Sequence, residues 1–153
     1  MLVTLGETAL RLSPPGTGRL ERADRLEVQA SGPESNAGVL ARRLGEPVTW
    51  LSRLPDSPLG RRVAGELRGY DLDVEVSWGE GRQGLTFHER GGAPRGDDRV
   101  DDRRGAAAAS LSMDDLPLDP VREADVAYVT GATPALSNDL AGATARFLKT
   151  AND

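Results

Sequence analysis

The most informative stretch of the chain reads Ser31-Gly32-Pro33-Glu34-Ser35-Asn36-Ala37-Gly38-Val39-Leu40-Ala41-Arg42-Arg43-Leu44-Gly45. It joins a polar, glycine-containing turn to an amphipathic helix. We expect the helix to begin at Ser35 and to end at Gly45, because apolar side chains recur between them at helical spacing and glycine commonly follows a last helical turn. A strand should precede the turn, since residues 25–30 alternate between polar and apolar side chains.

A turn of this kind has the chemistry of a site for a hydroxyl-rich ligand. Gly32 has no Cβ, so a ligand can approach the backbone closely. The first turn of the helix directs unpaired N–H groups and a partial positive charge at the same place. Asn36 adds a side chain that both donates and accepts hydrogen bonds. The same residues also fit a turn without a ligand, in which Ser35 only caps the helix.

On both sides of this stretch the pattern alternates between strands and helices. Further strands are expected at residues 2–6, 48–51, 74–78 and 126–130 (the first and the last of them buried), and further helices at 59–68 and 136–149. This alternation is typical of an α/β fold with a mostly parallel sheet covered by helices. Residues 79–102 interrupt it with glycines, a proline and a run of charged residues. Within them, apolar Leu85 and Phe87 alternate with polar residues, which predicts one more strand.

Composition sets bounds on size, location and partners. A chain of 153 residues suits one domain with a modest core. The net charge of -5 argues against a nucleic-acid surface, which needs clustered positive charge. The absence of cysteine excludes disulfides and thiolate metal sites. No apolar stretch is long enough to span a membrane and the N-terminus lacks signal-peptide features, so we expect a cytoplasmic protein without a membrane partner.

Several short motifs, in order along the chain, connect these observations to a known family. They are Thr4-Leu5-Gly6-Glu7-Thr8, Arg11-Leu12-Ser13-Pro14-Pro15, residues 31–36, Leu44-Gly45, residues 52–60, Gly84-Leu85-Thr86-Phe87, Arg103 with Gly105, and residues 131–137. In this order they resemble the PfkB (ribokinase-like) carbohydrate kinases, and most of all their 2-keto-3-deoxygluconate kinase branch. That branch has Gly-Gly-Ala-Glu-x-Asn at residues 31–36. The resemblance covers nearly the whole chain.

The resemblance implies a fold and its boundaries. We expect a ribokinase-like α/β fold: a mostly parallel sheet flanked by helices, with a small β-sheet lid whose strands fall at about residues 8–30 and 79–105. Residues 1–153 would be the N-terminal part of the kinase domain, truncated before the ATP-binding half. ATP and Mg²⁺ are the family's cofactors, and the Gly-Ala-Gly-Asp turn that serves them is absent here. The nearest string, at residues 131–134, lacks the aspartate.

The resemblance also implies which residues bind the substrate. They are Gly32, Pro33, Glu34, Ser35, Asn36, Thr86, Phe87 and Arg103. Arg103 matches the arginine that helps to hold the carboxylate of the keto-sugar acid, a group that suits the guanidinium fork. Asp101 stands where the family usually has a tyrosine, and its charge is expected to repel an acidic substrate. We predict no catalytic residue and no metal ligand in this chain.

Plainer interpretations of some of these residues remain open. Arg103 can be a solvated arginine in a charge-rich loop, and Phe87 a core residue of a small sheet. Glu7 follows the first strand, at an end where open sheets bind ligands, but it also fits a solvated turn. His88 has no evident carboxylate nearby in the sequence, and we interpret it as an exposed lid residue without a catalytic or metal role.

The function that follows is that of the sugar-binding half of a kinase that phosphorylates 2-keto-3-deoxygluconate with ATP, inactive by itself. The alternatives are a non-catalytic remnant, one subunit of a split enzyme, or a kinase fragment for another sugar or a nucleoside. The expected partners are a small sugar acid and either a complementary C-terminal half or a second copy of the chain. A homodimer would form through the lid sheet, with Leu26, Val28, Leu85 and Phe87 at the interface.

Overall fold

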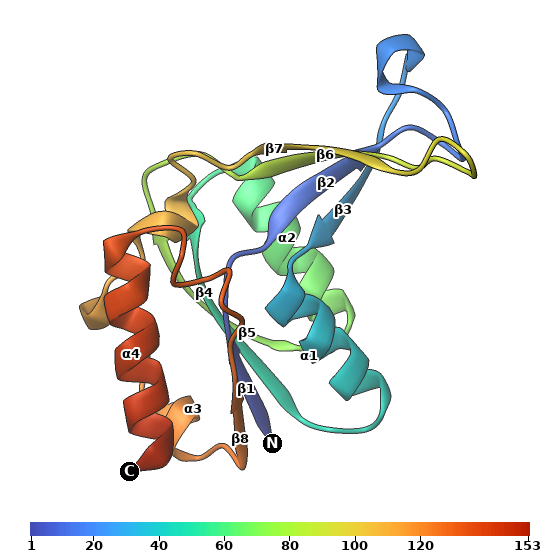
Figure 1. The fold of residues 1–153 in the computed structure, drawn as a ribbon. Coiled ribbons are helices and arrows are strands. Elements are labelled where there is room, and N and C mark those ends of the chain that lie inside the picture. The colour runs from blue at the N-terminus through green and yellow to red at the C-terminus, as the bar shows by residue number, and fades with distance from the viewer.

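In the computed structural model, which describes residues 1–153, a parallel sheet forms the centre of the fold (Figure 1). Its strand order is β5-β4-β1-β8, and every neighbouring pair is parallel. The strands are β1 (Leu2–Leu5), β4 (Val48–Pro55), β5 (Asp73–Gly79) and β8 (Val126–Tyr128). We call this sheet A. It confirms the expected mostly parallel sheet, and each strand overlaps a predicted one.

Helices cover both faces of sheet A, as Figure 1 shows. The helices α1 (Pro33–Arg43) and α2 (Pro58–Gly69) lie on one face, and α3 (Asp119–Arg122) and α4 (Asn138–Asn152) lie on the other. Two apolar clusters result. Trp50 of β4 packs with Val63 of α2 in one, and Leu5 of β1 packs with Phe147 of α4 in the other. The two central strands, β1 and β4, are covered on both faces and are therefore almost entirely buried, as expected for a parallel sheet.

A second, smaller sheet lies across the end of sheet A at which β1 and β4 finish (Figure 1). Its order is β3-β2-β6-β7, with β2 and β6 parallel and the two outer pairs antiparallel. The strands are β2 (Ala9–Ser13), β3 (Glu27–Ser31), β6 (Leu85–Glu89) and β7 (Asp98–Asp102). We call it sheet B. Three of its strands lie within the ranges 8–30 and 79–105 where lid strands were expected, and β3 ends one residue beyond the first range, at Ser31.

Sheet B is joined to sheet A and to α1 by very short connections. Only residues 6–8 separate β1 from β2, and only Gly32 separates β3 from α1. The apolar side of sheet B packs against the α2 cluster, with Leu10 buried and Val28, Ala30 and Leu85 partly buried there. Val28 and Leu85, which were expected at a dimer interface, therefore contact the protein's own core.

Two details differ from the sequence-based expectations. Helix α1 begins at Pro33 and not at Ser35, because proline suits the first helical position, where its missing N–H costs nothing. The strand β8 is not buried: Val126 is 57% exposed and Tyr128 38%, since β8 is the outer strand of sheet A. The charged run at residues 98–102 forms an edge strand, β7. No helix has the length and apolarity needed to cross a membrane.

Candidate functional site

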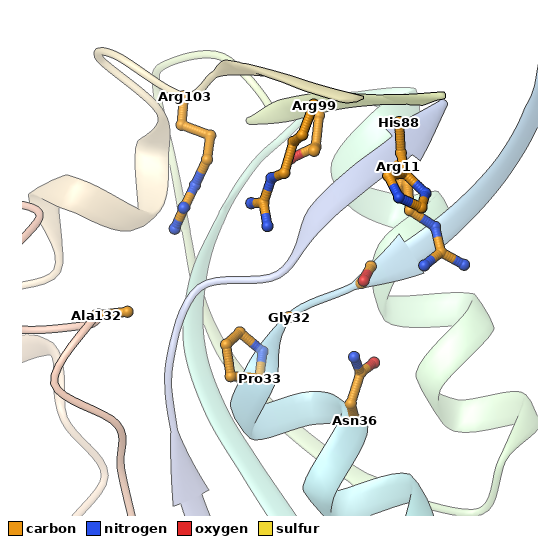
Figure 2. A pocket seen from close by; sticks show the side chains of 10 residues that line it. Arg11, Gly32, Pro33, Asn36, His88, Arg99, Arg103 and Ala132 are labelled. Atoms are coloured by element: carbon orange, nitrogen blue, oxygen red, sulfur yellow. The ribbon is translucent and has the colours of Figure 1, made fainter. Parts of the chain in front are cut away.

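A cavity of about 330 Å³ lies between sheet B and the start of α1. This is a size that can hold a small polar molecule. Figure 2 shows arginine side chains reaching down from sheet B and the segment that follows it, toward the first turn of α1. The lining residues are Arg11, Ser31, Gly32, Pro33, Asn36, Thr86, His88, Arg99, Arg103 and Ala132. Five of the eight predicted substrate-binding residues are among them: Gly32, Pro33, Asn36, Thr86 and Arg103.

The start of α1 forms one wall of the cavity, and Gly32 allows its position. Gly32 is the N-cap and has an extended backbone, with φ at -156°. A Cβ at this position would lie 2.2 Å from the backbone oxygen of Glu7, so any larger residue would push α1 away from the segment that joins β1 to β2. The requirement for glycine comes from this close approach. On the cavity side of the same turn, Asn36 points its amide toward the arginines (Figure 2).

Glu34 and Ser35 were predicted to bind substrate, but they do not line the cavity. Successive helical residues are rotated by about 100°, so Pro33 and Asn36, three apart, share the cavity face while the two residues between them turn inward. Glu34 is 1% exposed. Its Oε1 accepts hydrogen bonds from Thr130 N (2.9 Å), Thr130 Oγ1 (2.6 Å) and Thr133 Oγ1 (2.7 Å).

Ser35 has a similar role on the other side of the turn. Its hydroxyl accepts a hydrogen bond from Thr8 Oγ1 at 2.7 Å and donates to the Gly32 carbonyl at 3.2 Å. Together with Glu34, it ties the first turn of α1 to both neighbouring segments of the cavity wall. These two residues hold the wall in place and do not form its surface.

Sheet B supplies the opposite wall. Side chains alternate between the two faces of a strand, so Thr86 and His88 of β6 face the cavity together with Arg11 of β2 and Arg99 of β7. Phe87 lies on the other face, and the cavity does not include it. Thr86 and Phe87 were both predicted to contact a ligand, and of the two only Thr86 lines the cavity.

Arg103 reaches the cavity while held by an ion pair. Its Nε donates to Glu7 Oε2 at 2.9 Å, and its Nη2 donates to the same oxygen. The Glu7 side chain is only 3% exposed and that of Arg103 is 23% exposed. Burial lowers the pKa of the Arg103 guanidinium, but the hydrogen bond and charge of Glu7 raise it by more, so this pKa lies above its ordinary value. Glu7 is therefore a buried ion-pair partner and not a solvated turn residue.

Asp101 was expected to repel an acidic substrate, but its charge is balanced locally. Arg99 Nε donates to Asp101 Oδ1 at 2.9 Å, and Thr86 Oγ1 donates to the same oxygen at 3.1 Å. Opposite charges at this distance largely cancel beyond their immediate neighbourhood. Asp101 thus orients two cavity residues, Thr86 and Arg99, and its repulsion of an anion is offset by the paired guanidinium.

His88 also differs from its interpretation as an exposed residue without a carboxylate nearby. It lines the cavity, and its Nε2 lies 3.4 Å from Asp97 Oδ2. The backbone N–H of Gly91 donates to Asp97 and, with the charge of His88 adding to it, holds the pKa of this carboxyl below its ordinary value. No three His, Cys, Asp or Glu side chains are grouped so that they could hold a metal ion.

With this geometry in view, comparison with known proteins identifies the family. The family model for pfkB family carbohydrate kinases matches residues 1–153. The chain belongs to this family. The PfkB assignment agrees with the resemblance found in the sequence and with the observed arrangement of sheet A, sheet B and their helices.

The chain is similar to several members of the PfkB family. It is 47% identical to the 2-dehydro-3-deoxygalactonokinase of Haloferax volcanii over 153 residues, which are 99% of this chain and 48% of that protein. The crystal structure of the 2-dehydro-3-deoxygluconokinase of Thermotoga maritima matches with a TM-score of 0.95 and 31% identity, covering 99% of this chain and 47% of that one. The chain spans about half the length of the curated relatives it matches.

A third match concerns the fold alone. The sugar kinase PH1459 of Pyrococcus horikoshii, solved in complex with ATP, has a TM-score of 0.83 at 22% identity, covering 97% of this chain and 49% of that one. Kinases of the PfkB family use ATP.

Five residues of the cavity lie outside the predicted site. They are Arg11, Ser31, His88, Arg99 and Ala132. Strand alternation could have found His88, because it is two residues from Thr86 on a predicted strand. It could not have found Arg99, since the charged sequence of β7 carries no apolar alternation. Ala132 reaches the cavity only because Thr130 and Thr133 bind Glu34, a contact across 96 and 99 residues.

Proposed function

We propose that this chain is the sugar-binding half of a PfkB-family kinase and that its cavity holds a 2-keto-3-deoxy sugar acid, with 2-keto-3-deoxygluconate as the first candidate. The observation that carries the proposal is the chemistry of the two walls. One wall offers the start of α1 with the Asn36 amide, and the other offers Thr86 and three arginines. Sugar hydroxyls need donors and acceptors, and a carboxylate needs a cation. The cavity provides both.

The proposed contacts follow from the position of each side chain. Asn36 would donate to and accept from hydroxyl groups, and the positive end of α1 would favour the ligand's oxygen atoms. The surface of Gly32 and Pro33 would pack against the carbon skeleton. Thr86 and Arg103 would contact the ligand from the opposite wall.

In this proposal three of the predicted residues support the cavity without contacting the ligand: Glu34, Ser35 and Phe87. Glu34 and Ser35 keep the first turn of α1 fixed through their hydrogen bonds to Thr130, Thr133 and Thr8. Phe87 occupies the other face of β6. A site held by packed and hydrogen-bonded supports keeps its geometry when the ligand arrives.

The choice of substrate rests on the relatives. The Haloferax and Thermotoga proteins are kinases for 2-dehydro-3-deoxygalactonate and 2-dehydro-3-deoxygluconate, and "2-keto" is another word for "2-dehydro". We infer that this chain, acting in the cytoplasm, binds a sugar acid of this kind. Another sugar or a nucleoside is the alternative, and a neutral sugar such as ribose or fructose would have no use for the arginines.

In this proposal the nucleotide does not bind in the cavity. The carboxylates beside the cavity are engaged: Glu7 by Arg103, Asp101 by Arg99, Asp97 by His88, and Glu34 by two threonines. A carboxylate that is held in this way is poorly placed to take a proton from a sugar hydroxyl. We propose that residues outside this chain bind ATP and Mg²⁺ and supply the catalytic base. A coupled ATP-consumption assay should then show no turnover by this chain alone.

Two partners are consistent with the exposed surfaces. A complementary chain could add strands beside β8, where Val126 and Tyr128 are exposed at the edge of sheet A. A second copy could instead cover the outer part of sheet B, where Val100 is exposed beside Phe87. We favour the complementary half, because only it would also supply the catalytic base. Restored turnover on mixing with such a half would support this choice, and a homodimer without turnover would oppose it.

Isothermal titration calorimetry with 2-keto-3-deoxygluconate tests the main proposal. The wild-type chain should bind it, and ribose and fructose should bind far more weakly. Asn36→Ala should lower the affinity about tenfold, the loss expected for one good hydrogen bond in a cavity. Asn138→Ala, on an exposed residue at the start of α4, is the matched control and should bind as wild type.

Two results would contradict the proposal in different ways. Equal affinity of the Asn36→Ala variant and wild type would place binding elsewhere on the molecule. A wild-type chain that binds no sugar acid would favour the non-catalytic remnant.

A further inference from the structure

Three arginines line the cavity, but their charges are not equally available to a ligand. Arg103 uses Nε and Nη2 on Glu7, and Arg99 uses Nε and Nη2 on Asp101. A guanidinium that is already paired presents little net charge to a third group. A ligand carboxylate that took either arginine away would also leave a protein carboxylate without its partner, and for the buried Glu7 that loss is severe.

Arg11 is the exception. Its Nη2 donates to Gln29 Oε1, an uncharged amide oxygen. None of the ion pairs in the chain includes Arg11. The positive charge of the arginines is thus balanced at Arg99 and Arg103 and remains uncompensated at Arg11.

The position of Arg11 suits a ligand contact. It lies in the middle of β2, with its Cα paired to Gln29 of β3 and Thr86 of β6, so its backbone is fixed on both sides. In Figure 2 its guanidinium lies above Asn36, at the end of the cavity away from Arg103 and Ala132. A second hollow of about 320 Å³ adjoins this end and shares Arg11, Ser31 and Asn36 with the cavity. The side chain therefore has room to turn from Gln29 to a ligand.

It is favourable for Arg11 to exchange the amide oxygen of Gln29 for a ligand carboxylate. A hydrogen bond from a guanidinium to a carboxylate is charge-assisted and stronger than one to a neutral amide. Gln29 is exposed, and water can satisfy its amide once Arg11 has moved. This movement leaves no protein carboxylate without its positively charged partner. A movement of Arg103 or Arg99 would do so.

We propose that Arg11, with Asn36 beside it, binds the carboxylate of the sugar acid and is the residue that selects acids over neutral sugars. This inference rests on the proposed function, because it assumes a sugar acid in the cavity. It differs from the role that the family resemblance gives to Arg103. In this chain Arg103 holds the wall through Glu7, and the sugar acid lies with its carboxylate toward Arg11 and its other end toward Ala132.

The test compares two ligands that differ only in the group that Arg11 is proposed to bind. They are 2-keto-3-deoxygluconate and 3-deoxyfructose, in which a hydroxymethyl group replaces the carboxylate. Arg11→Gln should lower the affinity for the acid by about tenfold or more, the loss of one charge-assisted hydrogen bond. The affinity for 3-deoxyfructose should change by less than about twofold, because no charged contact is lost. Arg11→Lys, which keeps the charge without the fork, should fall between wild type and Arg11→Gln.

Arg43→Gln is the matched control for net charge. Arg43 lines the second hollow but not the cavity, and it stacks on Tyr70, with its Cζ 5.5 Å from the ring centroid, so its loss should leave both affinities unchanged. Circular dichroism melts establish that each variant is folded. Acid binding that survives Arg11→Gln, or an equal loss for both ligands, would overturn the inference while the proposed function stands. A wild-type chain that binds neither ligand would overturn both.

Discussion

Arg103 and Glu7, 96 residues apart in the sequence, form an ion pair that joins the end of sheet B to the segment leaving β1. Because the Glu7 side chain is almost completely buried, Arg103→Met would leave a carboxylate without its counter-charge. We expect a loss of about 2 kcal/mol in the free energy of unfolding, below the value for a fully buried pair because Arg103 is partly exposed. Urea denaturation at pH 7 measures this loss.

The chain offers a matched exposed pair as control. Arg82 donates to Asp102 from the same region, and both side chains are more than two-fifths exposed. Arg82→Met should cost clearly less than Arg103→Met, because exposed ion pairs contribute little to stability. Equal losses in the two variants would mean that burial of Glu7 contributes nothing to the stability of the cavity wall.

Gly32→Ala should destabilise the protein and weaken ligand binding. The added methyl group would lie 2.2 Å from the Glu7 carbonyl oxygen, so the start of α1 must move. We expect a loss of about 1–3 kcal/mol in unfolding free energy, the usual range for overpacking. Gly65→Ala in α2 is the control with opposite sign. A Cβ there meets nothing within 4 Å, and alanine should stabilise the helix by about 0.5–1 kcal/mol. Stabilisation by both variants would refute the close approach at Gly32.

Glu34→Ala should loosen the wall that contains Ala132. The change leaves the Thr130 N–H and the hydroxyls of Thr130 and Thr133 without their acceptor. Unsatisfied buried donors make a loss of about 2–3 kcal/mol the expected result in thermal or urea unfolding. Affinity for the sugar acid should fall as well, although Glu34 does not touch the cavity. Glu21→Ala, on an exposed turn, should change neither quantity, and a Glu34→Ala variant that behaved in the same way would rule out this supporting role.

Asp115 makes stability depend on pH. The N–H and hydroxyl of Ser112 donate to its carboxylate, and with the charge of Arg53 they hold the pKa of Asp115 below its ordinary value of 3.8. A carboxyl whose pKa is lowered by folding stabilises the protein above its unfolded pKa, and this contribution is lost as the pH falls through the folded value.

The measurement for Asp115 is a pair of urea titrations on Asp115→Asn and wild type. At pH 7 the variant should be less stable by about 1 kcal/mol, the usual worth of such a cap, and the difference should shrink once the pH drops below 3.8. Asp114→Asn, at the exposed neighbour, should match wild type at both pH values. A difference for Asp115→Asn that grew toward acid pH would contradict the assigned direction.

Much of the fold could be predicted from the sequence because local periodicity sets it. The strands of sheet A and the helices on its faces follow from apolar spacing, and the position of Asn36 at the cavity follows from the turn before α1. The prediction was wrong where a shift of one or two residues changes the direction in which a side chain points. Starting α1 at Pro33 in place of Ser35 turns Glu34 inward, since each helical residue adds about 100° of rotation.

The rest of the site depends on contacts between distant segments, which local patterns do not record. Glu7 looks like a turn residue until β7 and the residues after it bring Arg103 beside it. Arg99 has no apolar neighbours to indicate a strand, and it faces the cavity only because β7 pairs with β6. The charge at Arg11 stands out only after the partners of the other two arginines are known.

The single residue between β3 and α1 limits how the site can move. Sheet B has no flexible tether there, because Ser31 is still paired to Ala9 and Pro33 already belongs to the helix. Gly32 is thus a pivot shared by both walls. A tilt of sheet B over a bound molecule must either swing the first turn of α1 or twist the backbone at this one position. Opening or closing of the cavity therefore changes the direction of the Asn36 amide in the same motion.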